Sequence, residues 1–340
     1  MYSDDDLNAA VNAHILTEQH VQTFREFIAQ QRQSPAVDEE NFRLVSSFND
    51  IFVVIASILL LVAVGALGGA ITPALAGLAI ATTAWGLAEF FTRKRHMALP
   101  SIVLLFAYAG GIAFFTGILL IGGAAHTPSK PHMIMLTALL TALATAVHWW
   151  RFHVPITVAV GVAATVVIGL SPVMMGSHNP ESALLPYLFV AGVAVFAFAM
   201  HWDMRDPKRQ SSQTDVAFWL HLLAAPLLVH PVFVTVGSGA NLSITAALMI
   251  MLMYIVLAGV SLVIDRRALM VSALFYVIYA LNTLMKSFGD IGLHFAITAL
   301  FIGAMLLLLS AFWHRCRGYM MHIVPHTWRV RLPADQSKIA

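Results

Sequence analysis

Residues 50–69 read DIFVVIASILLLVAVGALGG, and Asp50, at the start, is the one charged residue in this run. A helix of about 20 residues rises about 30 Å, which matches the hydrocarbon thickness of a bilayer. The whole chain has the same character: 59% of its 340 residues are hydrophobic and 11% are charged, with a mean hydropathy of +0.80. Soluble domains are roughly 45–50% apolar and about 25% charged. The sequence therefore predicts an integral membrane protein whose first partner is the lipid bilayer.

Nine more apolar runs follow the first one, divided by charged residues or by proline and glycine. Together they predict an all-α polytopic bundle of about ten transmembrane helices, at 50–69, 71–91, 97–122, 133–150, 154–174, 183–202, 216–237, 242–264, 267–287 and 290–313. The runs lack the alternation of a membrane β-strand and are about twice its length, which argues against a barrel. The chain thus divides into a helical segment and linker at 1–49, the bundle at 50–313 and a basic tail at 314–340.

Basic residues mark one side of this predicted bundle. They follow the even-numbered runs and fill the tail: Arg93, Lys94, Arg95, Arg151, Arg205, Lys208, Arg209, Arg266, Arg267, Arg315, Arg317, Arg329, Arg331 and Lys338. The loops and flanks on the other side hold only Lys130 and Lys286. Because Lys and Arg collect in cytoplasmic loops, we expect the N-terminus and the C-terminus in the cytoplasm.

The segment 1–49 is the one sizeable part outside the predicted membrane. Apolar residues recur there at helical spacing, which predicts two short helices. Thr17 is suited to cap the second helix, because its hydroxyl can accept a backbone N–H. Three aspartates at positions 4–6 stand where a signal peptide needs positive charge. Residues 1–40 are interpreted either as a hairpin that lies on the bilayer or as a module that binds a protein partner.

Several chemistries lack the residues they need. The net charge of +2 is too small for a nucleic-acid surface. The single cysteine, Cys316, excludes a disulfide within one chain and a cysteine-based metal site. The chain has no zinc-protease, phosphate-loop or nucleophile-elbow motif, so we expect no enzyme activity, no metal and no cofactor. A haem between His230 and His294 is the one arrangement left open, since haem needs histidines on facing helices.

The seventh run carries two histidines and two prolines: His221, Pro226, His230 and Pro231. Proline has no N–H and clashes with the carbonyl four residues before it, so the carbonyls of Leu222 and Leu227 should lose their usual partners. Freed carbonyls at membrane depth persist only inside protein or beside a wet cavity. Two interpretations follow: a kink that serves packing, or a binding site on this helix.

The ninth run carries a polar stripe. Its members are spaced by four, three, four and three residues, which puts them on one face of a helix: Ser272, Tyr276, Tyr279, Thr283 and Lys286. His294, in the tenth run, could share a layer with His230, Lys286 and Asp290 and form a pocket open to the outside. The candidates for solute binding or proton relay are therefore His221, His230, Tyr276, Tyr279, Thr283, Lys286 and His294. Hydrogen bonds between helices are the alternative explanation of such a stripe.

Three further patterns predict contacts between or within helices. Glu89 and Arg93 have the spacing and order of a helical ion pair. The fourth run carries a stripe that is better explained by close packing: Thr137, Thr141, Thr145 and His148. Small residues that allow helices to approach closely include Gly65, Gly68, Gly69, Gly110 and Gly111.

Two stretches carry a resemblance to known sequences. They are ILTEQ at 15–19 and WGLAEFFTRKR at 85–95. With the polar start of the chain and the hydrophobic run that follows, they resemble uncharacterised bacterial multi-pass membrane proteins grouped as a domain of unknown function. The resemblance covers the first third of the chain. It implies a location in the bacterial inner membrane and brings no activity or catalytic residue with it.

Two functions fit these features. The first is a permease for a small solute, with a polar site near the seventh, ninth and tenth runs and proton coupling through His221 or His230. The second is a non-catalytic sensor, scaffold or assembly protein that acts through the helices of residues 1–40. Loss of transport on removal of either imidazole would favour the first function. Loss of the phenotype on deletion of residues 1–40 would favour the second.

Overall fold

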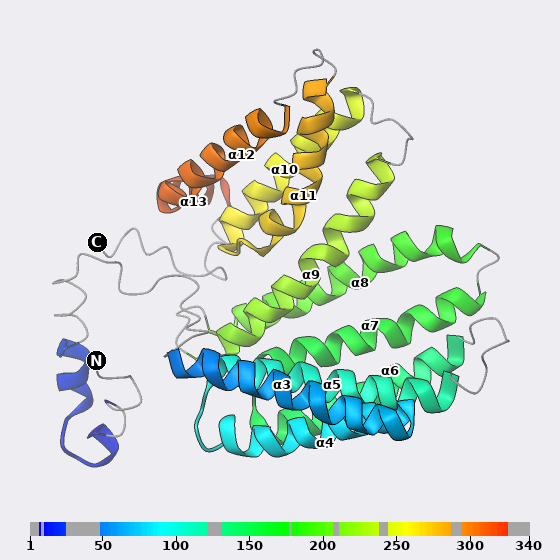
Figure 1. The fold of residues 1–340 in the computed structure, drawn as a ribbon. Helices are drawn as coiled ribbons and strands as arrows, with labels where there is room; N and C mark the ends of the chain where they lie inside the picture. The colour runs from blue at the N-terminus through cyan, green and yellow to red at the C-terminus, as the bar shows by residue number, and fades with distance from the viewer. Residues whose placement is uncertain are drawn as a thin grey trace. The chain divides into compact units, whose positions relative to one another are not determined.

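The computed structural model describes Leu7 and residues 10–24, 48–121, 131–176, 179–206, 211–237, 244–286 and 294–325. All regular structure in these ranges is helical, without a β-strand (Figure 1). The predicted all-α class is therefore confirmed.

Seven helices in the described ranges are long and apolar enough to cross a membrane. They are α3 (Phe48–Ile71), α4 (Pro73–Phe91), α5 (Ala98–Ile121), α6 (Pro131–Phe152), α7 (Ile156–Gly176), α8 (Pro180–Asp203) and α9 (Ser212–Gly237). Local signals set their ends. In α4, for example, Pro73 stands in the first turn and the Thr72 hydroxyl accepts the N–H of Leu75 at 3.3 Å, an N-terminal cap that satisfies a backbone donor.

Three more helices occupy the predicted eighth, ninth and tenth runs: α10 (Ile244–Ile264), α11 (Ala268–Lys286) and α12 (His294–Ala311). Their apolar stretches, over the described residues, are 10–17 residues long. A multi-pass membrane protein is thus supported, and the count of ten spans stays a prediction. One helix was not predicted at all, since α13 (Trp313–Ile323) lies where the sequence indicated only a basic tail.

The N-terminal segment is a separate compact unit from the bundle. Residues 10–12 and 18–24 are helical. The hydroxyl of Thr17 accepts the N–H of His20 at 3.2 Å, so the predicted cap of the second helix is confirmed. The linker predicted at 34–40 falls outside the described residues.

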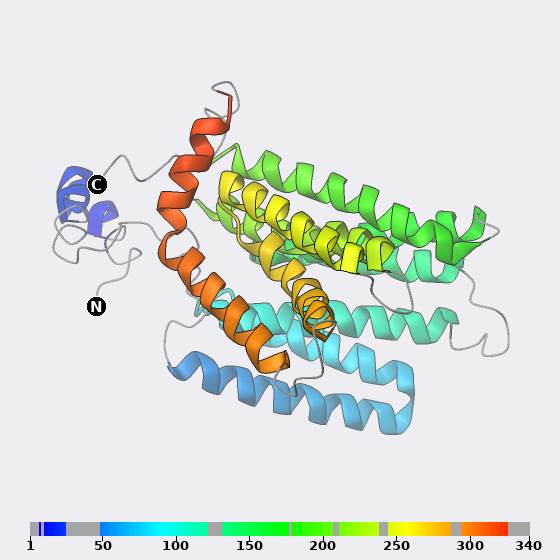
Figure 2. The ribbon, with the colours of Figure 1, turned by 90° about the horizontal axis from the view of Figure 1, so that it is seen from above.

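Helix α9 is the most enclosed of the seven long helices. It contacts α7, α8, α10 and α11, and Figures 1 and 2 show it between the α3–α8 layer and the C-terminal helices. Half of its apolar stretch is buried (50%), against 17–28% in the other six. Side chains on α9 are therefore the ones best placed to meet other helices instead of lipid.

The two prolines predicted to break this helix lie inside it, and α9 continues through both Pro226 and Pro231. A methyl group built on Gly192 of α8 would lie 2.9 Å from the backbone of Leu227 and Leu228. This contact packs the stretch between the prolines against α8. The backbone of Leu227, whose carbonyl was predicted to lose its helical partner, thus lies against protein.

Helices α4 and α5 touch through their backbones. A methyl group built on Gly111 would lie 2.7 Å from the carbonyl oxygen of Gly77, and one built on Gly77 would lie 2.6 Å from the carbonyl oxygen of Gly111. Real side chains do not tolerate such distances, so two glycines facing each other set the helix separation. The neighbouring Gly110 differs, because a methyl group there meets none of the described atoms within 4 Å.

Replacing Gly111 with alanine should force α4 and α5 apart. We expect Gly111→Ala to lower the free energy of unfolding by about 1–3 kcal/mol, as overpacking usually does. Gly110→Ala is the matched control and should leave stability unchanged or raise it, because alanine favours a helix over glycine. Equilibrium unfolding in mixed detergent micelles measures both variants. Equal stability of the two would contradict the backbone contact.

Candidate functional site

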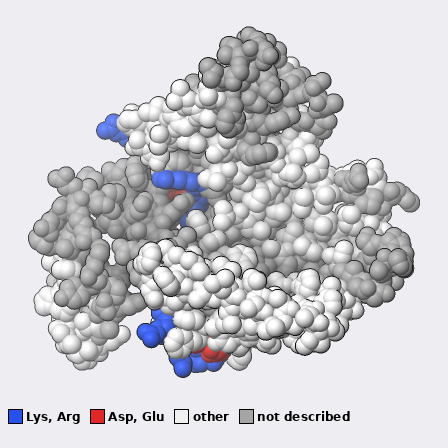
Figure 3. Space-filling model, in the orientation of Figure 1, with Lys and Arg blue, Asp and Glu red and all other residues white. Residues whose placement is uncertain are grey.

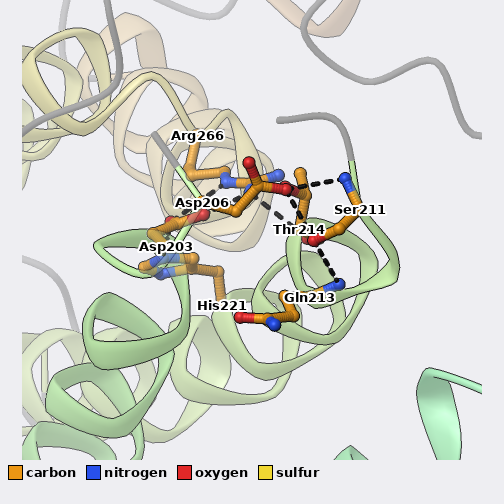
Figure 4. A network of polar contacts seen from close by, with 7 residues as sticks. All are labelled: Asp203, Asp206, Ser211, Gln213, Thr214, His221 and Arg266. Carbon is orange, nitrogen blue, oxygen red and sulfur yellow. Dashed lines mark hydrogen bonds and ion pairs between the residues drawn. The ribbon is translucent and has the colours of Figure 1, made fainter. Parts of the chain in front are cut away.

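A buried network joins the end of α8, the first half of α9 and the turn between α10 and α11 (Figure 4). Asp203 is its centre. One carboxylate oxygen, Oδ2, lies 2.8 Å from Nε2 of His221, and the other, Oδ1, accepts a hydrogen bond from Arg266 Nη2 at 2.5 Å. The three residues are only 4%, 1% and 1% exposed. A histidine, a carboxylate and a guanidinium therefore share one enclosed site.

The turn after α10 places Arg266. Asp265 has a left-handed backbone (φ 58°), a conformation that aspartate adopts more readily than most residues. The N–H of Arg266 donates to the carbonyl of Ser261 at 3.0 Å, and the hydroxyl of Ser261 donates to the carbonyl of Arg266. Both backbone groups of Arg266 are thus held by one buried serine, which directs its side chain toward α8.

The turn between α8 and α9 has its own polar cap, in which Asp206 Oδ2 accepts three hydrogen bonds. Two come from the N–H and hydroxyl of Ser211, both at 2.7 Å, and one from the hydroxyl of Thr214 at 3.2 Å. The Thr214 carbonyl in turn accepts a bond from Arg266 Nη2 at 3.3 Å. The cap and the His221–Asp203–Arg266 site are therefore continuous.

On its other side the α10–α11 turn holds α13. The carboxylate of Asp265 accepts a hydrogen bond from the indole of Trp313 at 2.9 Å and lies 3.5 Å from Nε of Arg317. The guanidinium of Arg267 lies over the Trp313 ring at 4.8 Å. Three consecutive residues of one turn thus bind two different parts of the chain.

The arrangement of His221, Asp203 and Arg266 suits proton binding. Arg266 balances the charge of the buried carboxylate, so Asp203 can stay ionised away from water. The imidazole beside it is the side chain that exchanges protons near neutral pH. The ring of Phe196, 5.3 Å from that of His221, covers the imidazole from α8. The site therefore holds an imidazole directly beside a carboxylate at a position between helices.

A second polar contact lies further along α9. Nδ1 of His230 is hydrogen-bonded to the hydroxyl of Tyr276 on α11, and the Tyr276 ring stacks on Phe233 at 5.0 Å. Two predicted site residues from the seventh and ninth runs are thus brought together. Because nine residues of helix turn through about 180° and rise about 13 Å, His221 and His230 face opposite sides of α9.

The other predicted candidates belong to α11 and α12, whose helical backbone is described. The side chains of Tyr279, Thr283, Lys286 and His294 lie outside the described residues, so the expected pocket around Lys286 and His294 stays a prediction. The described residues do form a groove of about 300 Å³ elsewhere. Its walls come from α4, α5 and α6 and include Trp85, Tyr108 and Val147, so it is separate from α9.

The α6 stripe is buried, as the packing interpretation predicted, with Thr141, Thr145 and His148 facing inward. His148 is enclosed by aromatic rings, among them Phe152 at 4.6 Å and Tyr108 at 5.6 Å. The predicted Glu89–Arg93 pair is confirmed at 3.4 Å, but Arg151 of α6 binds the same carboxylate more closely, at 2.7 Å and 3.0 Å. Glu89 therefore mainly links α4 to α6 through Arg151.

Sequence reasoning selected His221 but missed Asp203, which binds it, and Arg266, which binds Asp203. Arg266 was counted only among the basic residues of the cytoplasmic side, and Asp203 was not singled out. Their one available signal was position, since each stands within a residue or two of a predicted helix end. That position does not reveal burial.

Comparison with protein-family models, with curated proteins and with solved structures finds no match for this chain. The resemblance noted at residues 15–19 and 85–95 thus stays an expectation. Over the described residues, no group of three or more His, Cys, Asp or Glu side chains could hold a metal ion.

Removing one member of the buried ion pair should destabilise the fold. We expect Asp203→Ala to lower the free energy of unfolding by about 3–5 kcal/mol, because it leaves the Arg266 charge unpaired in the interior. Arg205→Ala is the control and should change it by about 1 kcal/mol or less, because Arg205 is exposed and loses only its contact with the Trp202 ring.

The double variant Asp203→Ala/Arg266→Met removes both charges and should recover part of the loss. Unfolding in mixed micelles measures these three variants together with Arg266→Met alone. A double variant as unstable as the sum of its single variants would show that the two side chains do not interact.

Proposed function

We propose that this chain is a small-solute permease in which α9 carries the functional site and the His221–Asp203–Arg266 site responds to protons. The observation that carries the proposal is the nearly complete burial of these three side chains where α8, α9 and the α10–α11 turn meet. Taking charged groups out of water costs several kcal/mol for each ion, and the attraction within a pair repays this cost only in good geometry. Well-packed apolar residues often stabilise such a position as well or better, so a functional role explains the charges more readily than stability does.

A proton on His221 changes how the carboxylate of Asp203 is shared. With His221 neutral, Arg266 is the cation that balances Asp203 among the described residues. With His221 protonated, two cations compete for it, and the link between α8 and α9 gains strength relative to the link with the α10–α11 turn. A site whose two protonation states favour different helix contacts can bias a conformational equilibrium.

The His230–Tyr276 contact supplies a second polar position on α9, and we assign to it contact with the solute or its coupled proton. It joins α9 to α11, whereas the His221 site joins α9 to α8 and the α10–α11 turn. Polar groups on opposite sides of one helix, at two heights, allow that helix to contact a solute or a proton in more than one arrangement of the bundle.

The orientation that accompanies this proposal puts both termini in the cytoplasm of a bacterial cell. Every Lys and Arg side chain within the described residues lies at or after the C-terminal end of α4, α6, α8, α10 or α12: Arg93, Lys94, Arg95, Arg151, Arg205, Arg266, Arg267, Arg315 and Arg317. Figure 3 shows these basic atoms toward one side of the view. Cytoplasmic ends collect such residues, which supports the same orientation.

Transport can be tested with purified protein in proteoliposomes on a solid-supported membrane. Solutes from a panel of amino acids, sugars and organic acids are added at several pH values, and the charge movement is recorded. We expect at least one solute to give a current that depends on pH. His221→Gln should remove this pH-dependent current, because glutamine keeps a hydrogen bond but cannot take up a proton.

His201→Gln is the matched control, since His201 is an exposed residue in the last turn of α8 and its variant should behave as the wild type. Deletion of residues 1–40 should also leave the current in place. An unchanged current in a folded His221→Gln protein would overturn the role of His221. The scaffold function would be favoured instead by two results together. None of the panel solutes gives a current, and cells that produce the chain without residues 1–40 show the same defect as cells that lack the chain.

A further inference from the structure

Helix α13 has two different faces. Trp313, Arg317 and Met321 recur every four residues and are buried. Trp313 packs toward Leu262 and Met270, Arg317 lies beside Asp265, and Met321 packs toward Ile264 and Leu269. The opposite face is exposed and combines large apolar side chains with polar ones such as His322. Tyr319 and Ile323 on it are 77% and 76% exposed. Large apolar side chains grouped on an open helix face indicate a surface that contacts another phase or partner.

The chain itself brings α13 to the end of a hydrophobic helix. Helix α12 ends at Ala311 after the apolar stretch Ile302–Ala311, and α13 begins two residues later at Trp313. If α12 crosses the membrane as predicted, α13 starts where hydrocarbon meets headgroups. Tryptophan and tyrosine are enriched in that layer because one end of each side chain is apolar and the other polar.

The contacts of the buried face prevent α13 from rotating freely. The Asp265 carboxylate binds both Trp313 and Arg317, one turn apart, and Arg267 stacks on the Trp313 ring. The exposed face is therefore a fixed surface that is presented away from α10. Next to it, the guanidinium of Arg315 lies over the ring of Phe312 at 5.7 Å, so a positive charge is held directly beside the apolar side chains.

The exposed part of α13 carries positive charge at Arg315, whereas Arg317 is buried and paired with Asp265. Between Asp290 and Asp335 the chain contains no acidic residue, whereas Arg315, Arg317, Arg329 and Arg331 fall in this interval. A surface of basic and apolar side chains without carboxylates complements an anionic, partly apolar partner. The cytoplasmic leaflet with anionic phospholipids is such a partner, and basic helices with apolar faces bind there in the plane of the membrane.

We propose that the exposed face of α13 binds the anionic lipid surface beside the end of α12. Phe312, Tyr319 and Ile323 enter the boundary between headgroups and acyl chains, and Arg315 contacts lipid phosphate. The inference does not depend on the permease proposal, because it concerns the face of α13 turned away from the His221–Asp203–Arg266 site.

The position of this face can be measured in the full chain. In a Cys316→Ser background, which removes the only cysteine, Tyr319→Cys is labelled with an environment-sensitive fluorophore. The protein is reconstituted in phosphatidylcholine, or in equal parts phosphatidylcholine and phosphatidylglycerol. We expect quenching by nitroxide-labelled lipid in both membranes, with stronger quenching when phosphatidylglycerol is present, and little quenching by aqueous acrylamide. Ile323→Cys provides a second label site if the first variant does not fold.

A matched pair of arginines tests the charge. The preference for phosphatidylglycerol is the factor by which this lipid increases nitroxide quenching of the label at position 319. Arg315→Gln should reduce this factor roughly fivefold, the usual effect of one basic side chain near an anionic leaflet. Arg95→Gln is the control, because Arg95 is also exposed and lies over a phenylalanine ring, Phe90, at 5.6 Å. It should leave the preference unchanged.

Two results would overturn the proposal. Quenching by acrylamide but not by lipid nitroxide would place the face in water. Protection from both quenchers that grows with protein concentration would show that a second copy of the chain covers it.

Discussion

The ion pair between Asp203 and Arg266 is the constraint on which the centre of this bundle depends. A carboxylate and a guanidinium that are both almost fully buried persist only together, because either charge without the other would stand in an interior of low dielectric constant. The end of α8 and the α10–α11 turn must therefore stay within hydrogen-bonding distance. His221 also binds the carboxylate of Asp203, and the Thr214 carbonyl accepts a further bond from Arg266, which brings the start of α9 into the same constraint.

Adjacent residues of the α10–α11 turn extend the constraint in two directions. The side chain of Arg266 reaches α8 and α9, and that of Asp265 holds Trp313 and Arg317 of α13. The left-handed backbone at Asp265 and the two bonds to Ser261 fix the turn that makes this possible. The proposed proton-responsive site and the proposed lipid-binding helix are therefore attached to the two sides of one rigid turn.

How far the sequence predicted the site depends on the kind of residue. His221 and His230 were recognised because a histidine in an apolar run is unusual and costly. Asp203 and Arg266 were not, because a charged residue at a helix end has an ordinary explanation in the membrane interface. Helix α13 was missed for a similar reason. Its buried face combines Trp313, Arg317 and Met321, and a stripe with an arginine in it does not look apolar in a sequence.

The sequence by itself determined the membrane class, the all-helical fold and the position of the seven long helices, because hydrophobic length follows directly from composition along the chain. It also determined the local contacts at Thr17 and between Glu89 and Arg93, which depend only on spacing within one helix. Tertiary structure alone decided that Arg151 binds Glu89 more closely than Arg93 does, that Gly77 faces Gly111, and that Asp203, His221 and Arg266 share one site. Such contacts join residues far apart in the chain, and hydropathy does not specify which helices are neighbours in a bundle.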